Sequence, residues 1–347
     1  ARLLHAPEEA FAETVDNIRI CGGGSLFIVA YNVLGAVFRG IGDARTPLFT
    51  VMLACVINIG GDLLLVEGFH LGAAGAALAT VISQGISGLA CLVYMIKKFP
   101  ILHMSPEERR LDGRSCRTLC FMGVPMGLQY SITAIGSIFL QSAVNGLGSL
   151  YVAAVAAGAK LFQLLGCPYD ALGATMATYC GQNVGACKLD RLGQGMRACA
   201  WLGLGYAMLA VGAMLLFAPQ CAMLFLNQDE ADLARLVSLT SQYITTLTAF
   251  FFPLALVNIV RFSLQGMGFS QLAILAGVLE MAARTVMGQV FVPLFGFTAA
   301  CFASPVAWIS ADLFLIPAAI LCIRHLRKLY PDQTEEAALR PVRAEGP

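Results

Sequence analysis

A carboxylate, an amide and a hydroxyl fall at spacings that could build a cation site inside an apolar helix pair. Asp62 follows Asn58 at an i, i+4 spacing, which places both side chains on one helix face. Thr80 stands on the next apolar stretch, after a short link that makes the two helices antiparallel neighbours. Asp62 lies about 22 Å along its helix from Pro47, and Thr80 about 11 Å into the next. Such oxygen ligands suit a hard cation such as Na⁺, and the carboxylate could instead carry a proton.

Further polar side chains interrupt apolar stretches, where each is costly and therefore a candidate for function. Four of them are candidates for the lining of a polar cavity or a substrate site: Asn32, Gln84, Gln129 and Asp170. Glu280 and Arg284 also stand four residues apart on one helix face, and we predict that they form a structural pair.

A second chemistry must be weighed, because Gly40-Ile-Gly-Asp43 and Tyr169-Asp170 match the two aspartate motifs of intramembrane proteases. Two carboxylates that share a proton can activate water. Here, however, the order of the motifs is reversed, and Asp43 lies between Arg39 and Arg45 in a turn. The chain has no phosphate-binding loop, and its 4 histidines are scattered, so no nucleotide or metal cofactor is expected.

The composition favours a membrane protein. Of the 347 residues, 58% are hydrophobic and only 12% are charged, against about 25% charged in a soluble domain. The formal net charge of +1 provides no basic field for nucleic acid, so no nucleic-acid partner is expected. The 12 cysteines fall singly, mostly in apolar stretches, and predict no disulfide framework.

Apolar stretches of about 20 residues, the length that crosses a bilayer as a helix, occur about nine times. They are predicted at Val15–Phe38, Pro47–Val66, Ala73–Ile96, Leu119–Val144, Tyr151–Cys180, Met196–Phe217, Leu236–Phe262, Leu272–Phe295 and Phe297–Ile323. The stretches do not alternate as barrel strands would. The predicted fold class is all-α and polytopic. Basic residues concentrate in every second connection, which predicts a cytoplasmic C-terminus.

Two parts of the chain repeat each other in the same orientation. Asn32–Gly42 matches Asn258–Gly268, and Gly72–Thr80 matches Gly296–Ser304. A parallel repeat of this kind is typical of transporters. Three more apolar stretches precede the second copy and none precedes the first. Equal halves therefore predict that roughly a hundred residues and three helices are missing before Ala1.

Several motifs, taken in their order, resemble the multidrug and toxic compound extrusion (MATE) family. They are Tyr31-Asn32, Arg39-Gly-Ile-Gly-Asp43, Thr46-Pro47, Asn58-Ile-Gly-Gly-Asp62, Gly72–Thr80, Ser83-Gln84, Gly181-Gln-Asn-Val-Gly185, Leu264-Gln-Gly-Met-Gly268 and the pair Glu280/Arg284. The chain is most similar to the prokaryotic branch that includes the DNA-damage-inducible protein F.

The resemblance implies twelve helices in two six-helix lobes around a central cavity. Residues 1–98 would hold helices 4–6, residues 99–117 the cytoplasmic linker and residues 118–330 helices 7–12, with a disordered cytoplasmic tail at 331–347. It also implies a monomer in the bacterial cytoplasmic (inner) membrane that exchanges Na⁺ or H⁺ for organic cations and drugs. Asn58, Asp62 and Thr80 match the family's coupling set. A first-helix aspartate of that set would precede Ala1.

Four readings of the function remain open. The first is drug efflux by cation antiport, in which the coupling ion is the only cofactor. A lipid-linked oligosaccharide flippase of the same superfamily would need a basic cavity, for which Arg261, Arg284 and Lys160 are available. A remnant that does not transport and the intramembrane aspartyl protease are the other two. One branch of the family uses a glutamate where this chain has Gln129, so coupling through the second lobe is not expected.

Overall fold

The computed structural model describes residues 8–99, 102, 112–226 and 232–330, and this part of the chain is helical without any strand. The chain divides into two compact units, Ala1–Leu111 and Asp112–Pro347. The tail predicted at 331–347 lies outside the described residues, so its predicted disorder is not addressed by the structure.

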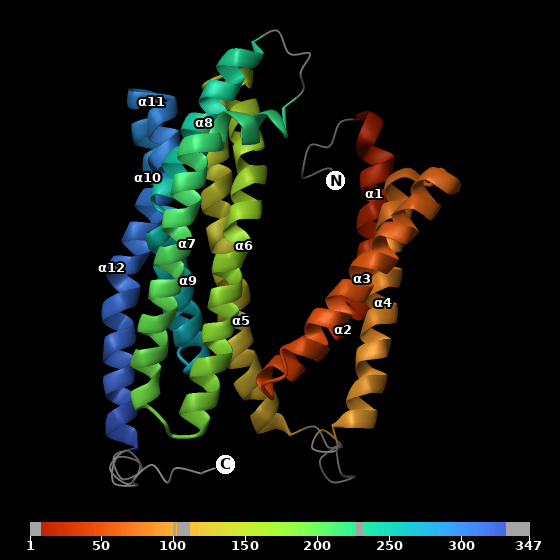
Figure 1. The fold of residues 1–347 in the computed structure, drawn as a ribbon, viewed down its shortest axis with the longest axis vertical. Helices are drawn as coiled ribbons and strands as arrows, with labels where there is room; N and C mark the ends of the chain where they lie inside the picture. Colours follow the sequence, from red (N-terminus) through yellow and green to blue (C-terminus); the bar gives the residue numbers. More distant parts are fainter. Residues whose placement is uncertain (1–7, 100–101, 103–111, 227–231, 331–347) are drawn as a thin grey trace. The chain divides into compact units, whose positions relative to one another are not determined.

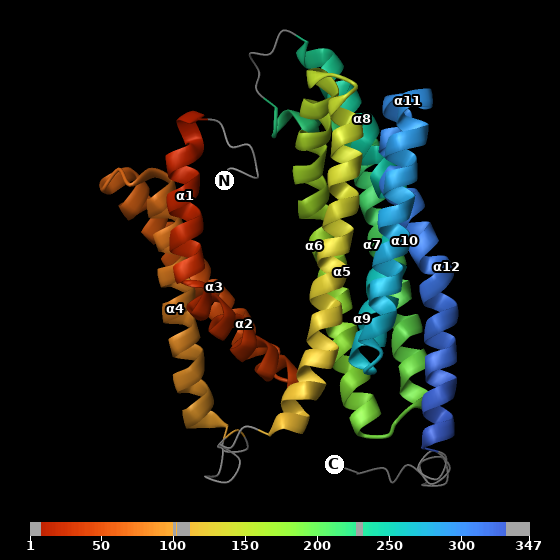
Figure 2. The ribbon, with the colours of Figure 1, turned by 180° about the vertical axis from the view of Figure 1, so that it is seen from behind.

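The first unit is built around one long helix. Its elements are α1 (Glu8–Gly23), α2 (Ser25–Gly40), α3 (Arg45–Asp62), the π-helical turn η2 (Leu63–Gly68) and α4 (Gly72–Lys98). Helices α1, α2 and α3 all pack on α4, as Figures 1 and 2 show from opposite sides. Small residues such as Ala77 and Ala79 fill the buried face of α4, which lets the backbones approach closely.

The second unit is a larger helix bundle with most of the buried core. Its elements are α5 (Gly113–Asn145), α6 (Ser149–Gly185), α7 (Asp190–Met223), α8 (Leu233–Ala249), α9 (Phe251–Gly266), α10 (Ser270–Val286), η4 (Met287–Phe291), α11 (Val292–Phe295) and α12 (Phe297–Leu329). α10 packs on α5 and α12, and α6 packs on α7, α8 and α9. The core gathers large side chains, among them Tyr169, Phe251 and Leu264, all less than 1% exposed.

The predicted spans are confirmed in number and position. Among the described residues, seven helices are long and apolar enough to cross a membrane, or nine if each of two bent helix pairs is one span. Each of the nine predicted stretches lies inside one of these helices or pairs. Their surfaces carry many large apolar side chains, as a lipid-facing bundle requires.

The prediction of continuous helices is wrong at the first and seventh stretches. The chain bends by 52° between α1 and α2, and by 50° between α8 and α9. The second bend follows from Pro253, whose ring excludes the carbonyl of Ala249, where α8 ends. At the first bend Gly24 lies so close to Val81 of α4 that no side chain would fit there.

The internal repeat is visible in the backbone. Each copy begins with a bent helix pair, and each later contains a π-helical turn, η2 or η4. Gly42 and Gly268, which match in sequence, both have φ of 91°. Gly72 and Gly296 match likewise, with φ of 54° and 64°. Left-handed φ values favour glycine, so the repeated glycines mark repeated turns. The parallel repeat is therefore confirmed at these positions.

Candidate functional site

A cavity of about 550 Å³ lies inside the second unit, between α5, α6, α8, α9, α10 and α12. One wall is aromatic, because the rings of Phe162 and Trp308 stack there with centroids 5.8 Å apart and planes 14° apart. Leu254 and Val257 extend this apolar wall. The volume falls in the range of about 300–1,000 Å³ that small-molecule sites occupy.

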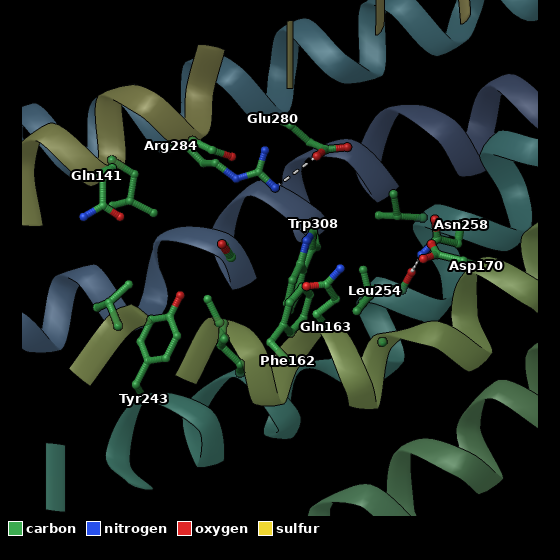
Figure 3. Close-up of a pocket in the computed structure, with 18 of the residues that line it drawn as sticks. Gln141, Phe162, Gln163, Asp170, Tyr243, Leu254, Asn258, Glu280, Arg284 and Trp308 are labelled. Atoms are coloured by element: carbon green, nitrogen blue, oxygen red, sulfur yellow. Dashed lines mark hydrogen bonds and ion pairs between the residues drawn. The ribbon is translucent and has the colours of Figure 1, made fainter. Parts of the chain in front are cut away.

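Polar side chains stand at the two ends of the cavity as Figure 3 presents it. Asp170 and Asn258 lie at one end, and Gln141 and Tyr243 at the other. Asn258 donates a hydrogen bond to the carbonyl of Leu254, at 3.3 Å, so part of its amide is already used. Asp170 places a carboxylate at this end of the cavity.

A buried ion triad forms another part of the wall. Oε1 of Glu280 accepts a hydrogen bond from Nη2 of Arg261, and Oε2 lies 3.2 Å from Nη2 of Arg284. The side chains of Arg261, Glu280 and Arg284 are only 9%, 3% and 8% exposed. Glu280 thus contacts the partner predicted from sequence and also Arg261, whose part in the cluster the sequence did not indicate. Buried charges of this kind need their partners.

The proposed cation ligands lie on α3 and α4 of the first unit. Nδ2 of Asn58 is 3.4 Å from Oγ1 of Thr80, and the Thr80 hydroxyl donates to the carbonyl of Ala76 at 3.0 Å. Asp62 follows on the same helix, and its Oδ1 is buried without a hydrogen-bond partner among the described residues. Asn58 and Thr80 are therefore in hydrogen-bond contact, whereas the buried Oδ1 of Asp62 is bonded to neither of them.

A close helix contact holds this region together. A Cβ added to Gly61 would lie 3.0 Å from the Cβ of Ala79, so α3 and α4 approach each other next to Asp62 and Thr80. The Asn58 side-chain oxygen and the Asp62 carboxylate are acceptors, as is the Thr80 hydroxyl oxygen. Among the described residues, no group of three or more His, Cys, Asp or Glu could hold a metal ion. Any cation here would depend on one carboxylate and on neutral oxygens.

The four residues predicted to line a cavity have different surroundings in the structure. Asp170 lines the cavity, whereas Gln129 does not and instead accepts a hydrogen bond from Gln265 at 3.3 Å. Asn32 donates to a carbonyl one turn earlier on its own helix, at 2.8 Å. Oε1 of Gln84 is buried without a partner among the described residues. Only Asp170 of this set is part of the cavity of the second unit.

Asp43 of the Gly-x-Gly-Asp motif has a local structural role. Its carboxylate accepts hydrogen bonds from the backbone N–H groups of Arg45 and Thr46, at 2.9 and 3.1 Å, and from the Thr46 hydroxyl. These bonds, that of the hydroxyl above all, hold the pKa of Asp43 below its usual value. A carboxylate that caps the first turn of α3 in this way is a common helix start. The motif therefore has a sufficient structural explanation.

The chain is similar in sequence to known multidrug resistance proteins. Residues 125–289 match the model of the family described as MatE. The chain is 30% identical over 259 residues to the probable multidrug resistance protein YpnP of Bacillus subtilis, which covers 75% of this chain and 56% of YpnP. It is 29% identical over 236 residues to YoeA, a second probable multidrug resistance protein of that organism, covering 66% of this chain and 51% of YoeA. The chain thus spans about half the length of these curated relatives.

Solved structures share the fold. A crystal structure of MATE in the bent conformation matches with a TM-score of 0.84 at 20% identity, over 94% of this chain and 72% of that chain. A MOP superfamily transporter from Pyrococcus furiosus matches with a TM-score of 0.86 at 19% identity, over 94% and 73%. At such identities the likeness shows the fold. Together the comparisons show that residues 125–289 match the MatE family and that the chain has the fold of MATE transporters.

Proposed function

We propose that the protein is a secondary active transporter that exports several chemically different drugs in exchange for Na⁺ or H⁺. The observation that carries the proposal is the cavity of about 550 Å³ within an apolar helix bundle, with an aromatic wall and the carboxylate of Asp170. The names of the curated relatives as multidrug resistance proteins point the same way. Such relatives are transporters, which leaves no support for the protease reading.

The proposed cargo is an amphipathic organic cation with a flat ring. Its ring would lie against Trp308 and Phe162, and its charge would be drawn to Asp170. An aromatic face also attracts a cation directly. Few other directional contacts are demanded of the cargo, which is how one site can accept several compounds.

We place the coupling ion in the first unit, at Asp62, Asn58 and Thr80. Asn58 and Thr80 already lie in contact, and the carboxylate oxygen of Asp62 has no partner among the described residues. Neutralising this carboxylate with Na⁺ or H⁺ would change its preference between two arrangements of the helices. Exchange requires only that each ligand binds the two states differently.

The coupling site is tested by efflux of ethidium, an aromatic cation, from cells that express the complete gene product. Asp62→Asn should abolish the dependence of efflux on the ion gradient at equal expression. Asp170→Asn should raise the ethidium concentration needed for half-maximal efflux while the gradient dependence stays. Asp190→Asn, on the exposed surface of the second unit, is the matched control. Gradient-driven efflux by the Asp62→Asn protein at the wild-type rate would refute the proposed coupling site.

We further propose that the protein is a monomer in the bacterial cytoplasmic membrane with its C-terminus inside. The support for this orientation is the basic last turn of α12, with Arg327 and Lys328. A reporter enzyme that is active only outside the cytoplasm, fused after Pro347, should be inactive. Reporter activity there would reverse the orientation.

A lipid-linked oligosaccharide flippase is the second candidate. It is favoured by one observation, namely that Arg261 and Arg284 both line the cavity, and guanidinium groups suit a diphosphate. Purified protein in liposomes should then move a fluorescent lipid-diphosphate sugar between leaflets without an ion gradient. Absence of such movement, with ethidium transport present, would exclude this candidate.

A further inference from the structure

We infer that the cavity of the second unit contains a subsite for an acidic group at Arg284, so that the preferred cargo is an aromatic zwitterion rather than a simple organic cation. The inference deepens the proposed export function and rests on it for the identity of the ligand as cargo. Its basis is the balance of charge in the triad and the placement of charges along the cavity.

The triad has more positive than negative charge. Two guanidinium groups, of Arg261 and Arg284, share the single carboxylate of Glu280, one oxygen each. Asp312 lies within electrostatic range of Arg261 but outside the cavity lining, and no ion pair joins the two among the described residues. Arg284 lines the cavity with only half of the Glu280 carboxylate as its counter-charge.

Hydrogen bonding in the triad is incomplete at both arginines, because Nε of Arg261 and Nη1 of Arg284 are buried without an acceptor among the described residues. A guanidinium has five N–H donors, and Glu280 accounts for only one nitrogen of Arg284. Nη1 of Arg284 is buried and has no acceptor among the described residues. A buried charged donor without an acceptor is costly. A carboxylate has the planar, two-oxygen shape that matches a guanidinium edge and would supply the missing acceptor.

The opposite charge lies elsewhere in the cavity. In Figure 3, Asp170 is drawn at one side and Arg284 at the other, with Trp308 and Phe162 between them. A cargo that fits all of these groups has an amine for Asp170, a ring for the aromatic wall and a carboxylate for Arg284. A simple cation would leave the buried Nη1 of Arg284 without an acceptor.

Calorimetric titration of the purified complete protein in detergent tests the subsite with three matched ligands. Naphthylalanine is the zwitterion, its methyl ester lacks the acidic group, and its N-acetyl derivative lacks the cationic one. We expect naphthylalanine to bind about tenfold more tightly than either derivative, since each loses one charge-assisted contact. Equal affinity of naphthylalanine and its methyl ester would overturn the inference. So would displacement by inorganic pyrophosphate with no binding of naphthylalanine, which would instead favour the flippase.

Two variants test which residue binds the acidic group of the ligand and which binds its cationic group. Arg284→Met should remove the advantage of naphthylalanine over its methyl ester, and Arg261 would still hold Glu280 in a one-to-one pair. Asp170→Asn is the matched control. It should remove the affinity advantage of naphthylalanine over its N-acetyl derivative and keep its advantage over the methyl ester. If Arg284→Met does not fold, Arg284→Lys keeps the charge without the planar fork and should reduce the advantage.

Export from cells separates this inference from the proposed function. If the methyl ester is exported and the carboxylate gives no gain in affinity, the subsite is wrong and the export function stands. If naphthylalanine binds with the expected pattern but neither compound is exported, the export function is wrong and the subsite stands.

Discussion

Removing the shared carboxylate of the triad should be the most damaging single charge change in the second unit. Glu280→Gln keeps the shape of the side chain and one acceptor oxygen but leaves two guanidinium groups without their counter-ion. The three side chains are 3%, 9% and 8% exposed, so water screens this repulsion poorly. Breaking a buried ion pair from one side typically costs about 3–5 kcal/mol. We expect a loss of that size in the free energy of unfolding.

The comparison with Arg284→Met makes the test specific. That change leaves Arg261 and Glu280 as a neutral pair, so it should cost less than about half as much. The measurement is unfolding of the purified protein in mixed detergent micelles with increasing dodecyl sulfate, followed by helix content. At about 1.4 kcal/mol per factor of ten, Glu280→Gln should raise the unfolded fraction at least a hundredfold. A smaller loss for Glu280→Gln than for Arg284→Met would refute the assignment of Glu280 as the shared counter-ion.

Three further predictions concern positions outside the cavity. Asp43→Asn keeps a capping oxygen but removes the negative charge at the N-terminus of α3, so it should destabilise the protein by about 0.3–1 kcal/mol at neutral pH. Because the folded-state pKa of Asp43 is lowered, this difference should persist above about pH 4 and vanish as the pH falls through that lowered pKa. Gly61→Leu should push α3 from α4 and weaken gradient-dependent efflux while expression persists; normal coupling would contradict the close-contact argument. Asp190→Asn, which removes an exposed ion pair with Arg327, should change the unfolding free energy by less than about 1 kcal/mol.

Much of the fold could be predicted from the sequence, because a bilayer restricts spanning segments to long apolar helices. All nine predicted stretches lie within observed helices, and the matched glycines Gly42 and Gly268 share one backbone conformation. What the sequence did not indicate is where the spans bend. Pro253 does carry a signal for the second bend, because its ring excludes the carbonyl four residues earlier. The π-helical turns carry no comparable signal in composition.

The cavity was harder to predict, for a physical reason. In a soluble helix the polar face marks the outside, but lipid is as apolar as the interior, so apolar periodicity does not orient a membrane helix. Gln129 and Asn32 therefore looked as suitable as Asp170, and only Asp170 lines the cavity of the second unit. The part of Arg261 in the triad was missed because it meets Glu280 from another helix, at no fixed sequence spacing.

The π-helical turn η2 places a register change directly beside Asp62. A π turn holds one residue more than an α turn, and passing that extra residue along a helix exchanges hydrogen-bond partners without a net loss of bonds. Asp62 is the last α-helical residue before Leu63, where the turn begins. If the extra residue moved toward the N-terminus by one turn, the Asp62 carboxylate would swing by about 100° around the axis of α3. Such a shift would reorient the only acid of α3 without unfolding the helix or tilting it as a rigid body.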